Sequence, residues 1–548
     1  MTEGTESAVS VTACSHVISF SASVKFQTDC KGHEKGLPCV KVIALKQPPR
    51  HKQGAPIENS IAYFFEVSTK VFEKLIKEFY KDPKDFASFV TGIDQELHRF
   101  GIQLLKETLE EMDDGIRASG QRKQTWVIDK KFNRELVTSL GTVNFARTHF
   151  RNKKDPTQFS FLLDHMLGLE EREHFTEDAK ARMLEEAVDT SYRRGGEAVN
   201  PAGDASKESV MNVIHGLQFP EDDWEKPTEK RQVEYLYIEA DEDHVHLQFR
   251  ETKGDLHKED GFKNNTIEPK LIYVHEGLRK EAPESKRYCL IHPRYFSRVT
   301  EGDGTRRLWN EVYRYISDTY DIDHVKKIYL NSDGGGWILM ARKELSGLTH
   351  VLDEFHLDKC LTKLTSHMLD SQGDARDEFR EAIRHRTKKD FQQILDRLKG
   401  YLPESRNTDA FDRTADYVLS NWMAAKVRLC HKDGVVGSST EGHVYHVLSK
   451  RMSTNPMGWS VVGTGKMCQL RAYHQNHGKM LELVRYQRQA MEKAAGAEDE
   501  VFPSVREIMN SEKKAHTDLE KYYDTYQHSI SSQVAKQFYL REQLSLLL

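Results

Sequence analysis

The sequence predicts a mixed α/β core with helical regions on both sides. Five segments alternate apolar and polar side chains as strands do, and helical spacing of apolar residues follows the third and the fourth of them. The order βββαβαβ is typical of an RNase-H-like mixed sheet with helices on both faces. We therefore expect an α/β RNase-H-like core with a helical insertion, a mainly helical N-terminal region and a helical C-terminal tail. The strand patterns lie at residues 233–241, 244–249, 270–275, 325–330 and 348–355.

The first 135 residues divide into an irregular part and a helical part. Residues 1–60 contain one strand pattern, at 17–26, and are then interrupted by glycine and proline. From residue 61 to 135 a helical region is predicted, because large apolar side chains such as Phe72 and Phe79 recur at three- and four-residue steps.

Residues 136–220 predict a β-hairpin followed by helices. The alternating segment 137–148 runs into a basic turn at 151–156, which suggests a hairpin with a basic tip. The Ser-capped helix expected at 206–215 resembles the recognition helix of a helix-turn-helix, so this part is a candidate DNA-binding region. An ordinary helical hairpin is the alternative.

The remaining chain alternates between the core and helical segments. A linker is expected at 220–227, because it combines two prolines with a run of acidic residues. The predicted parts are the first portion of the core at 230–360, the helical insertion at 361–432, the last portion of the core at 433–478 and the helical tail at 479–548.

Composition excludes several classes of protein. The 548 residues include 80 Lys and Arg against 85 Asp and Glu, for a net charge of -5, which decides nothing about nucleic acid because a binding surface needs only local positive charge. The seven cysteines form no CxxC pair, so neither a disulfide framework nor a Cys-rich zinc site is indicated. No run approaches the ~20 apolar residues that span a bilayer, and the acidic N-terminus does not resemble a signal peptide. A cytoplasmic protein is expected.

Three carboxylates stand where a metal site could form. Asp241 ends the first strand, Asp333 ends the fourth strand before a glycine triplet, and Glu441 begins a helix after a loop of small residues. Phosphodiester chemistry uses two divalent cations about 3.5–4 Å apart, and magnesium prefers carboxylate and water oxygens. The three elements therefore predict a site that holds two Mg²⁺ ions.

Each carboxylate also has a structural explanation. An Asp before Gly at a strand end is often a turn residue, and a Glu in the first turn of a helix complements the helix dipole. Asp243 shares strand parity with Asp241, so periodicity does not separate them. Asp241 is favoured because it still belongs to the apolar strand.

Several segments resemble the ISLre-two insertion-sequence family of DDE transposases. The resemblance covers about residues 135 to 480, and the segment around Glu441 is its most specific part. It is carried by residues 141–143, 162–164, 237–245, 328–334, 351–357, 439–452 and 455–460.

The resemblance implies a transposase that cuts donor DNA at the ends of its element and joins the 3′-OH to target DNA. It implies that Asp241, Asp333 and Glu441 are the catalytic metal ligands, with Mg²⁺ as cofactor and Mn²⁺ as a substitute. His356 is a possible auxiliary residue near the site, or else a helix-start histidine with a structural hydrogen bond. Double-stranded DNA and a homodimer or larger synaptic assembly are the implied partners, and the protein would associate with the nucleoid.

Basic side chains supply the candidate DNA contacts, although a short basic run is more often a solvated face. Trp422 and Trp459 could stack on a flipped base, but burial in a core is the favoured interpretation. The candidate contacts are Arg147, Arg151, Lys153 and Lys154 on the hairpin, Lys207 and Asn212 on the possible recognition helix, and Arg384, Arg386, Lys388 and Lys389 in the insertion.

Three other functions compete with this one. An RNase-H-like nuclease without strand transfer would use the same carboxylates. A domesticated DNA-binding protein would not need them, so the intact trio argues against it. A Rossmann-type nucleotide binder is rejected, because acidic residues and no glycine follow the first strand.

Overall fold

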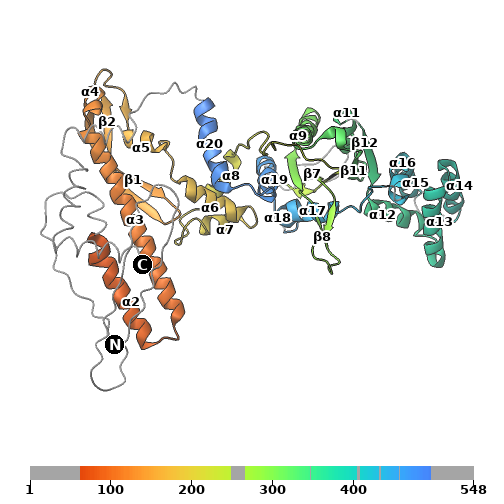
Figure 1. Ribbon diagram of the computed structural model, residues 1–548, viewed down its shortest axis with the longest axis horizontal. Helices are drawn as coiled ribbons and strands as arrows, with labels where there is room; N and C mark the ends of the chain where they lie inside the picture. Colours follow the sequence, from red (N-terminus) through yellow and green to blue (C-terminus); the bar gives the residue numbers. More distant parts are fainter. Residues whose placement is uncertain are drawn as a thin grey trace, which may run out of the picture.

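The computed structural model describes residues 62–248, 266–345, 347–403, 408–430, 433–455 and 457–494. These residues form an elongated molecule, with long helices at one end, a β-sheet in the middle and the helical insertion at the other end (Figure 1). Within these ranges no helix is both long and apolar enough to cross a membrane. The strand expected at 17–26, the segment 1–60 and the tail beyond residue 494 lie outside the described residues.

Five strands form the central mixed sheet: β4 (Tyr235–Glu242), β7 (Pro269–His275), β10 (Arg294–Val299), β11 (Lys327–Ser332) and β12 (Leu348–Leu352). Their order across the sheet is β10-β7-β4-β11-β12. The pairs β10–β7 and β7–β4 are antiparallel, whereas β4–β11 and β11–β12 are parallel. The central strand β4 therefore joins an antiparallel half to a parallel half.

One predicted strand does not belong to this sheet. In the segment 244–249, β5 (Val245–His246) pairs with β6 (Thr266–Ile267) in a separate two-stranded ribbon, and Leu247 forms an isolated bridge with Trp459. The third strand of the sheet is instead β10, which the sequence reasoning missed because Arg294 and Arg298 interrupt its apolar pattern.

The two faces of the sheet differ in chemistry. Ile238 and Leu330 point into an apolar core against α9 (Asp303–Thr319), which supplies Leu308, Val312 and Ile316. The opposite face carries aromatic and polar side chains, among them Glu239 and Tyr273, and is packed by helices from later in the chain. These helices are α16 (Trp422–Leu429), α17 (Thr440–Val444) and α19 (Val461–Gln475).

The N-terminal part is a helical hairpin beside a β-ribbon (Figure 1). The helical region ends nearer residue 125 than 135, because β1 (Trp126–Val137) occupies the last part of it. Val127, Ile128, Phe132 and Leu136 have near-helical spacing in the sequence, but all four lie in one strand, whose register shifts between Ile128 and Lys130. The elements are η1 (Phe64–Ser68), α2 (Thr69–Lys81), α3 (Phe86–Ala118), α4 (Gly120–Thr125), β1 (Trp126–Val137), β2 (Thr142–Asn152), β3 (Phe159–Ser160) and α5 (Leu162–Leu167).

The predicted hairpin with a basic tip is present, but it is the shorter of two. β2 pairs with β3 across the turn that holds Lys153 and Lys154, and over its whole length it pairs with β1. The longer hairpin turns at residues 138–141.

The predicted helix-turn-helix region shares a core with α19 and with α20 (Met480–Ala494). Val210 and Ile214 of α8 pack in one apolar cluster with Met467 of α19 and Leu483 of α20. The boundary expected near residue 220 therefore does not separate two cores. Trp224 in the predicted linker is itself buried, against Phe296 and Tyr315. The helices concerned are α6 (Glu177–Ala187), α7 (Tyr192–Glu197), α8 (Lys207–Gly216) and α20 (Met480–Ala494).

The helical insertion forms its own apolar core. Phe391, Leu395 and Val418 are buried in it, and Trp422 lies at its edge against Phe391. Trp459 is buried as well, which matches the favoured interpretation of both tryptophans. Its helices are α12 (Glu354–Thr365), α13 (Gln372–His385), α14 (Lys388–Lys399) and α15 (Asp409–Ser420). The remaining short elements are β8 (Leu278–Lys280), β9 (Tyr288–Leu290), η2 (Ile322–His324), α10 (Gly336–Leu339), α11 (Ala341–Glu344), η3 (Leu369–Ser371), η4 (Tyr445–Ser449) and α18 (Lys450–Met452).

Candidate active site

The two aspartates of the predicted trio lie near the carboxyl ends of two neighbouring parallel strands. In the parallel pair β4–β11, Glu239 is the register partner of Asn331. Asp241 lies two residues further along β4, Asp333 follows directly after the end of β11, and the charge of Asp333 raises the pKa of Asp241, so the two carboxylates are close enough to interact. The crevice outside the carboxyl ends of parallel strands is where open α/β sheets bind ligands.

A glycine turn shapes the position of Asp333. Gly334 has φ +86°, and a Cβ there would lie 2.5 Å from Oδ1 of Asn421, so a side chain would be both strained and too close. The backbone N–H of Gly335 donates to Oδ1 of Asp333 at 2.8 Å. The Tyr417 hydroxyl donates to the Asp333 carbonyl oxygen. Both Asn421 and Tyr417 belong to the insertion, which therefore braces this turn.

The fully buried carboxylate of Glu239 fixes the start of α17 against β4. Oε2 of Glu239 accepts hydrogen bonds from the Tyr273 hydroxyl at 2.5 Å, the Thr440 hydroxyl at 2.6 Å, and the Ser438 hydroxyl and the Ser439 backbone N–H at 3.1 Å each. Nε2 of His275 lies 3.3 Å from Oε1. Burial alone would raise the pKa of Glu239, but the hydrogen bond and charge of His275 and the hydroxyl donors outweigh it and lower the pKa well below the usual range.

Glu441 follows this anchor in the first turn of α17, where its side chain is 56% exposed. Its Oε1 lies 3.9 Å from Nε2 of His356. His356 is held from its other side by Asp353, which caps α12 and lies 3.0 Å from Nδ1 of the imidazole. The sequence left two alternatives for His356, a structural hydrogen bond or a position near the site. The structure shows both, because the imidazole is bonded to Asp353 and also lies beside Glu441.

The three carboxylates act on one another electrostatically. The pKa of Asp241 is raised to about 7, first by burial and then by the negative charges of Asp333, Glu242 and Glu441. Within the described ranges no three His, Cys, Asp or Glu side chains are gathered closely enough to hold an ion as they stand. The donor set nevertheless suits a hard divalent cation, which would relieve the repulsion that raises the Asp241 pKa.

Asp243 points elsewhere. The Ser453 hydroxyl donates to both of its carboxylate oxygens, at 2.8 and 3.1 Å. This side chain therefore has its own partner beyond the end of β4, which favours Asp241 as the ligand from this strand.

Sequence reasoning missed two buried residues that support the site. The sequence does contain a signal for Glu239. It is a charged residue within a buried strand and stands two positions before Asp241, so the two side chains lie on the same face of the sheet. Arg428 of α16 gave no local signal. Its guanidinium donates to Oδ1 of Asn331 at 2.8 Å, to the Leu352 carbonyl oxygen at 3.0 Å and to the Val436 carbonyl oxygen at 2.6 Å. It thereby ties the insertion to β11, β12 and the loop before α17.

Sequence comparison places the chain among known relatives. A family model described as Uncharacterised protein family (UPF0236) matches residues 81–490. The chain belongs to this family. UPF0236 protein TTE0402 of Caldanaerobacter subterraneus subsp. tengcongensis is 31% identical over 457 residues, which cover 81% of this chain and 86% of that protein. A second relative from the same organism, whose printed name joins eleven loci, is 31% identical over 78% of this chain and 85% of its own length.

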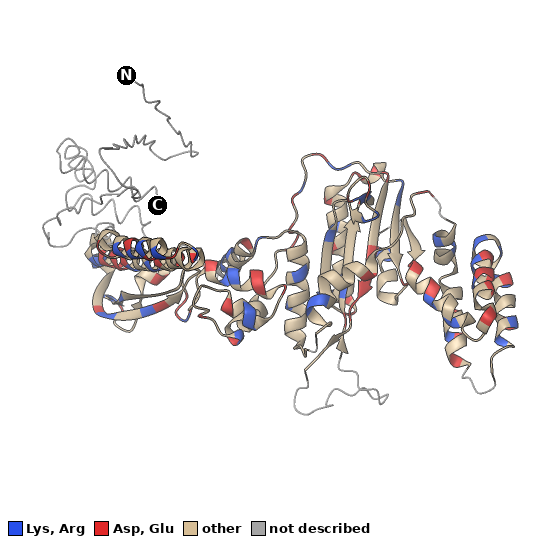
Figure 2. Ribbon diagram, turned by 90° about the horizontal axis from the view of Figure 1, so that it is seen from below, with Lys and Arg blue, Asp and Glu red and all other residues tan. Residues whose placement is uncertain are grey.

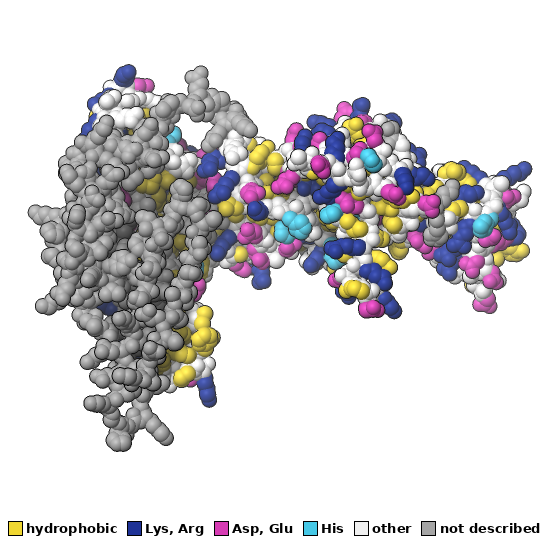
Figure 3. All heavy atoms as spheres, viewed as in Figure 1, with side chains coloured by type: hydrophobic (Ala, Val, Ile, Leu, Met, Phe, Trp, Pro, Cys, Tyr) yellow, Lys and Arg dark blue, Asp and Glu magenta, His cyan; other side chains and the backbone are white. Residues whose placement is uncertain are grey.

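The basic residues expected to contact DNA differ in accessibility in this UPF0236 protein. Arg147 is not available, because its side chain is buried and ion-paired with Asp164, and this corrects the prediction for that residue. Lys and Arg are spread over all three parts of the molecule rather than gathered in one (Figure 2). On the insertion they alternate with acidic side chains (Figure 3). The residues that stay exposed are Arg151, Lys153, Lys154, Lys207, Asn212, Arg386, Lys388 and Lys389, while Arg384 is half-buried.

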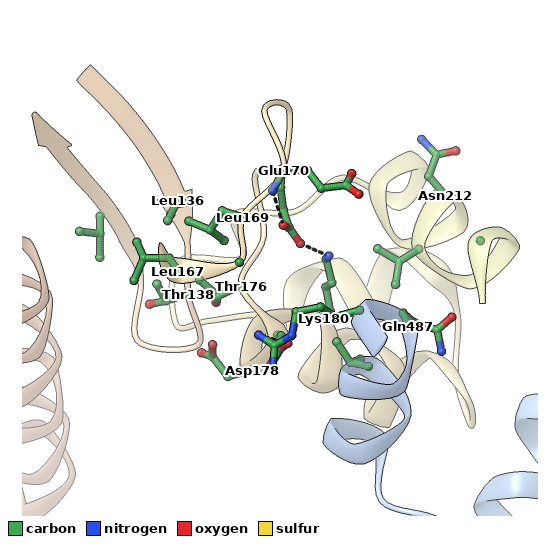
Figure 4. A pocket seen from close by; sticks show the side chains of 18 of the residues that line it. Leu136, Thr138, Leu167, Leu169, Glu170, Thr176, Asp178, Lys180, Asn212 and Gln487 are labelled. Carbon is green, nitrogen blue, oxygen red and sulfur yellow. Dashed lines mark hydrogen bonds and ion pairs between the residues drawn. The ribbon is translucent and has the colours of Figure 1, made fainter. Parts of the chain in front are cut away.

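A cavity of about 550 Å³ lies away from the carboxylates, between the N-terminal ribbon and the helices α6, α8 and α20 (Figure 4). Leu136, Leu169 and Val484 give it apolar walls. Its central charges, Lys180 and Glu173, are ion-paired with each other. None of the three candidate carboxylates lines this cavity.

His350 on β12 makes the stability of this region depend on pH. Its Nε2 lies 3.0 Å from the Ser332 hydroxyl, and burial first and the charge of Arg342 second lower its pKa from 6.5 to about 4. Between pH 6.5 and pH 4, His350 is therefore protonated in the unfolded chain but neutral in the folded protein. The free energy of unfolding decreases as the pH falls through this range. Between pH 7 and pH 5 we expect this group to lower the free energy of unfolding by about 2 kcal/mol.

Urea unfolding at the two pH values checks this expectation. His350→Gln keeps a polar group near Ser332 but does not titrate, so the variant should lose less stability at pH 5 than the wild type does. An equal loss in both proteins would mean that His350 is not the source.

Proposed function

We propose that this UPF0236 protein is a DDE transposase with an RNase-H-like core, which cuts DNA at transposon ends and joins the freed 3′-OH to target DNA. The observation that carries the proposal is that Asp241, Asp333 and Glu441 lie near the carboxyl ends of β4 and β11, close enough for the charges of Asp333 and Glu441 to raise the pKa of Asp241. They come from two neighbouring parallel strands and a helix packed on the first of them, although 200 residues separate the outer two.

Two further observations support this proposal. The sheet order, with three antiparallel strands followed by two parallel ones, is the arrangement that an RNase-H-like core requires. The name of one relative joins eleven loci of a single organism. A self-copying element would leave such repeated copies behind.

In the proposed reaction Asp241, Asp333 and Glu441 would hold two Mg²⁺ ions, for which Mn²⁺ could substitute. Bound divalent ions supply an activated water and stabilise the leaving oxygen in phosphodiester chemistry. Glu239 positions Glu441 through the start of α17. His356 places an imidazole beside Glu441, at the edge that the DNA phosphate would approach.

Double-stranded DNA is the proposed substrate, and pairing of two ends would require a homodimer or a larger assembly. Phosphate contacts by lysine and arginine would make binding weaken steeply with salt.

A strand-transfer assay tests the proposal. The full chain is incubated with Mg²⁺ or Mn²⁺ and with duplexes carrying the DNA that flanks its gene, either intact or pre-cut to expose the 3′-OH. We expect nicking at the intact ends. From the pre-cut ends we expect joined products, in which the donor 3′-oxygen bonds to a target phosphorus and the target strand leaves as a new 3′-OH.

The outcomes separate the rival enzymes. Cleavage without any joined product would favour the RNase-H-like nuclease. Failure of both reactions with both metals would overturn the proposal.

A further inference from the structure

The β-ribbon at the N-terminal end presents aromatic and basic side chains on one face. Directly paired residues on antiparallel strands point to the same side. Lys130 pairs with His149 and Arg151 pairs with Phe159, so these four side chains share a face. Phe132, two residues after Lys130, points the same way.

The rings on this face are in contact and partly open. His149 and Phe159 stack in parallel, with ring centroids 4.9 Å apart and an interplanar angle of 1°. Phe132 meets His149 edge-on at 5.5 Å. Phe159 is 46% exposed and Phe132 is 38% exposed, although phenylalanine side chains are usually buried. We call Phe132, His149 and Phe159 the aromatic platform.

The charge around the platform is mainly positive. Nζ of Lys130 lies 4.7 Å from the centroid of the Phe132 ring. Lys130 and Arg151 are exposed, and Lys153 follows at the turn after β2. Asp129, an acidic neighbour of Lys130, is paired with Nδ1 of His149 at 3.0 Å. This positive charge is complementary to the negative charge of a phosphate backbone.

The rest of the ribbon is committed to packing. At its far end the same face is closed, because Arg134 and Arg147 pair with Asp164 of α5. The opposite face contacts α3, where Thr148 bonds to Asp113 and Lys131 pairs with Asp114. The platform is therefore the open end of an otherwise occupied ribbon.

We propose that the aromatic platform binds unpaired nucleotides of single-stranded DNA, with bases stacked on Phe159 and Phe132 and phosphates held by Lys130 and Arg151. Exposed ring faces flanked by cations are the recognition chemistry of single strands, whose bases offer their faces. A duplex hides those faces within its stack and would not use the rings. The biological source of such a strand, a cut transposon end, rests on the proposed function, but the binding does not.

Fluorescence anisotropy tests the site with the full chain, a labelled oligodeoxythymidylate of about 20 nucleotides, longer than a typical footprint, and a duplex of matched length. Phe159→Ala and Phe132→Ala should each weaken single-strand binding roughly tenfold and leave duplex binding nearly unchanged. Tyr288→Ala, which removes an exposed ring on β9, is the control and should have no effect.

Charge is tested on the same strands. Arg151→Gln should lower the slope of log affinity against log salt by about 0.7 for the single strand. Lys131→Gln, on the opposite face, should leave the slope unchanged.

The outcomes are decisive whether or not the protein nicks DNA. Unchanged single-strand affinity in both phenylalanine variants would overturn the proposal, as would an equal loss for the duplex. A change in oligomeric state of Phe159→Ala, measured by light scattering without DNA, would overturn it in favour of a contact between copies of the chain.

Discussion

Replacing Asp333 with asparagine (Asp333→Asn) is expected to lower DNA nicking about a thousandfold, because a metal contribution of several kcal/mol would be lost. Asparagine has almost the same shape and keeps an oxygen that can accept the hydrogen bond from the Gly335 N–H. The turn should therefore survive, while the negative charge needed to hold a divalent cation is lost. DNA binding should be unchanged, since the exposed basic side chains are untouched.

The measurement compares nicking rates and binding affinities on one duplex. Asp323→Asn is the matched control, since it removes an exposed carboxylate near the opposite end of β11 and should nick at the wild-type rate. If Asp333→Asn nicks as fast as the wild type, Asp333 has no part in the mechanism.

The sequence could predict the sheet where strand patterns are apolar and continuous. β4, β7, β11 and β12 all lie where the alternation indicates. β10 was missed because its two arginines look like loop residues locally, yet Arg298 is satisfied by Glu311, 13 residues later, with two contacts of 3.1 Å. A strand whose charges are paired by a distant helix cannot be recognised from its own residues.

The positions of the candidate residues on the fold were predictable to the same extent. Asp241, Asp333 and Glu441 could be placed because each ends or begins an element with a recognisable pattern. Glu239 was passed over, because three of its hydrogen-bond donors lie about 200 residues further along the chain, at Ser438 to Thr440.

Arg147 shows the opposite error. Its basic neighbours suggest a DNA contact, but Asp164 on α5 pairs with it in the core. The local sequence shows that a side chain is basic. It does not show whether an acidic partner elsewhere in the chain pairs with it and keeps it from contacting DNA.

Replacing Glu239 with leucine (Glu239→Leu) is expected to lower the free energy of unfolding by roughly 3–5 kcal/mol, because removing one partner of a buried charged network leaves the others without compensation. The hydroxyls of Tyr273 and Thr440 would lose an acceptor in a place that water does not reach. Urea unfolding measures the loss. Glu234→Leu is the control, because this exposed glutamate precedes β4 and its replacement should change stability by about 0.5 kcal/mol or less.

The same substitution separates positioning from stability. Glu239 touches no substrate in the proposed reaction, but it holds the first turn of α17 against β4, so its loss should also release Glu441 from the edge where the two aspartates lie. Nicking measured at low temperature, where the variant remains folded, should therefore fall in Glu239→Leu and recover partly in Glu239→Gln, which keeps one oxygen acceptor for these donors. Wild-type nicking by the folded leucine variant would mean that α17 keeps its place without this carboxylate, and that the buried network serves stability alone.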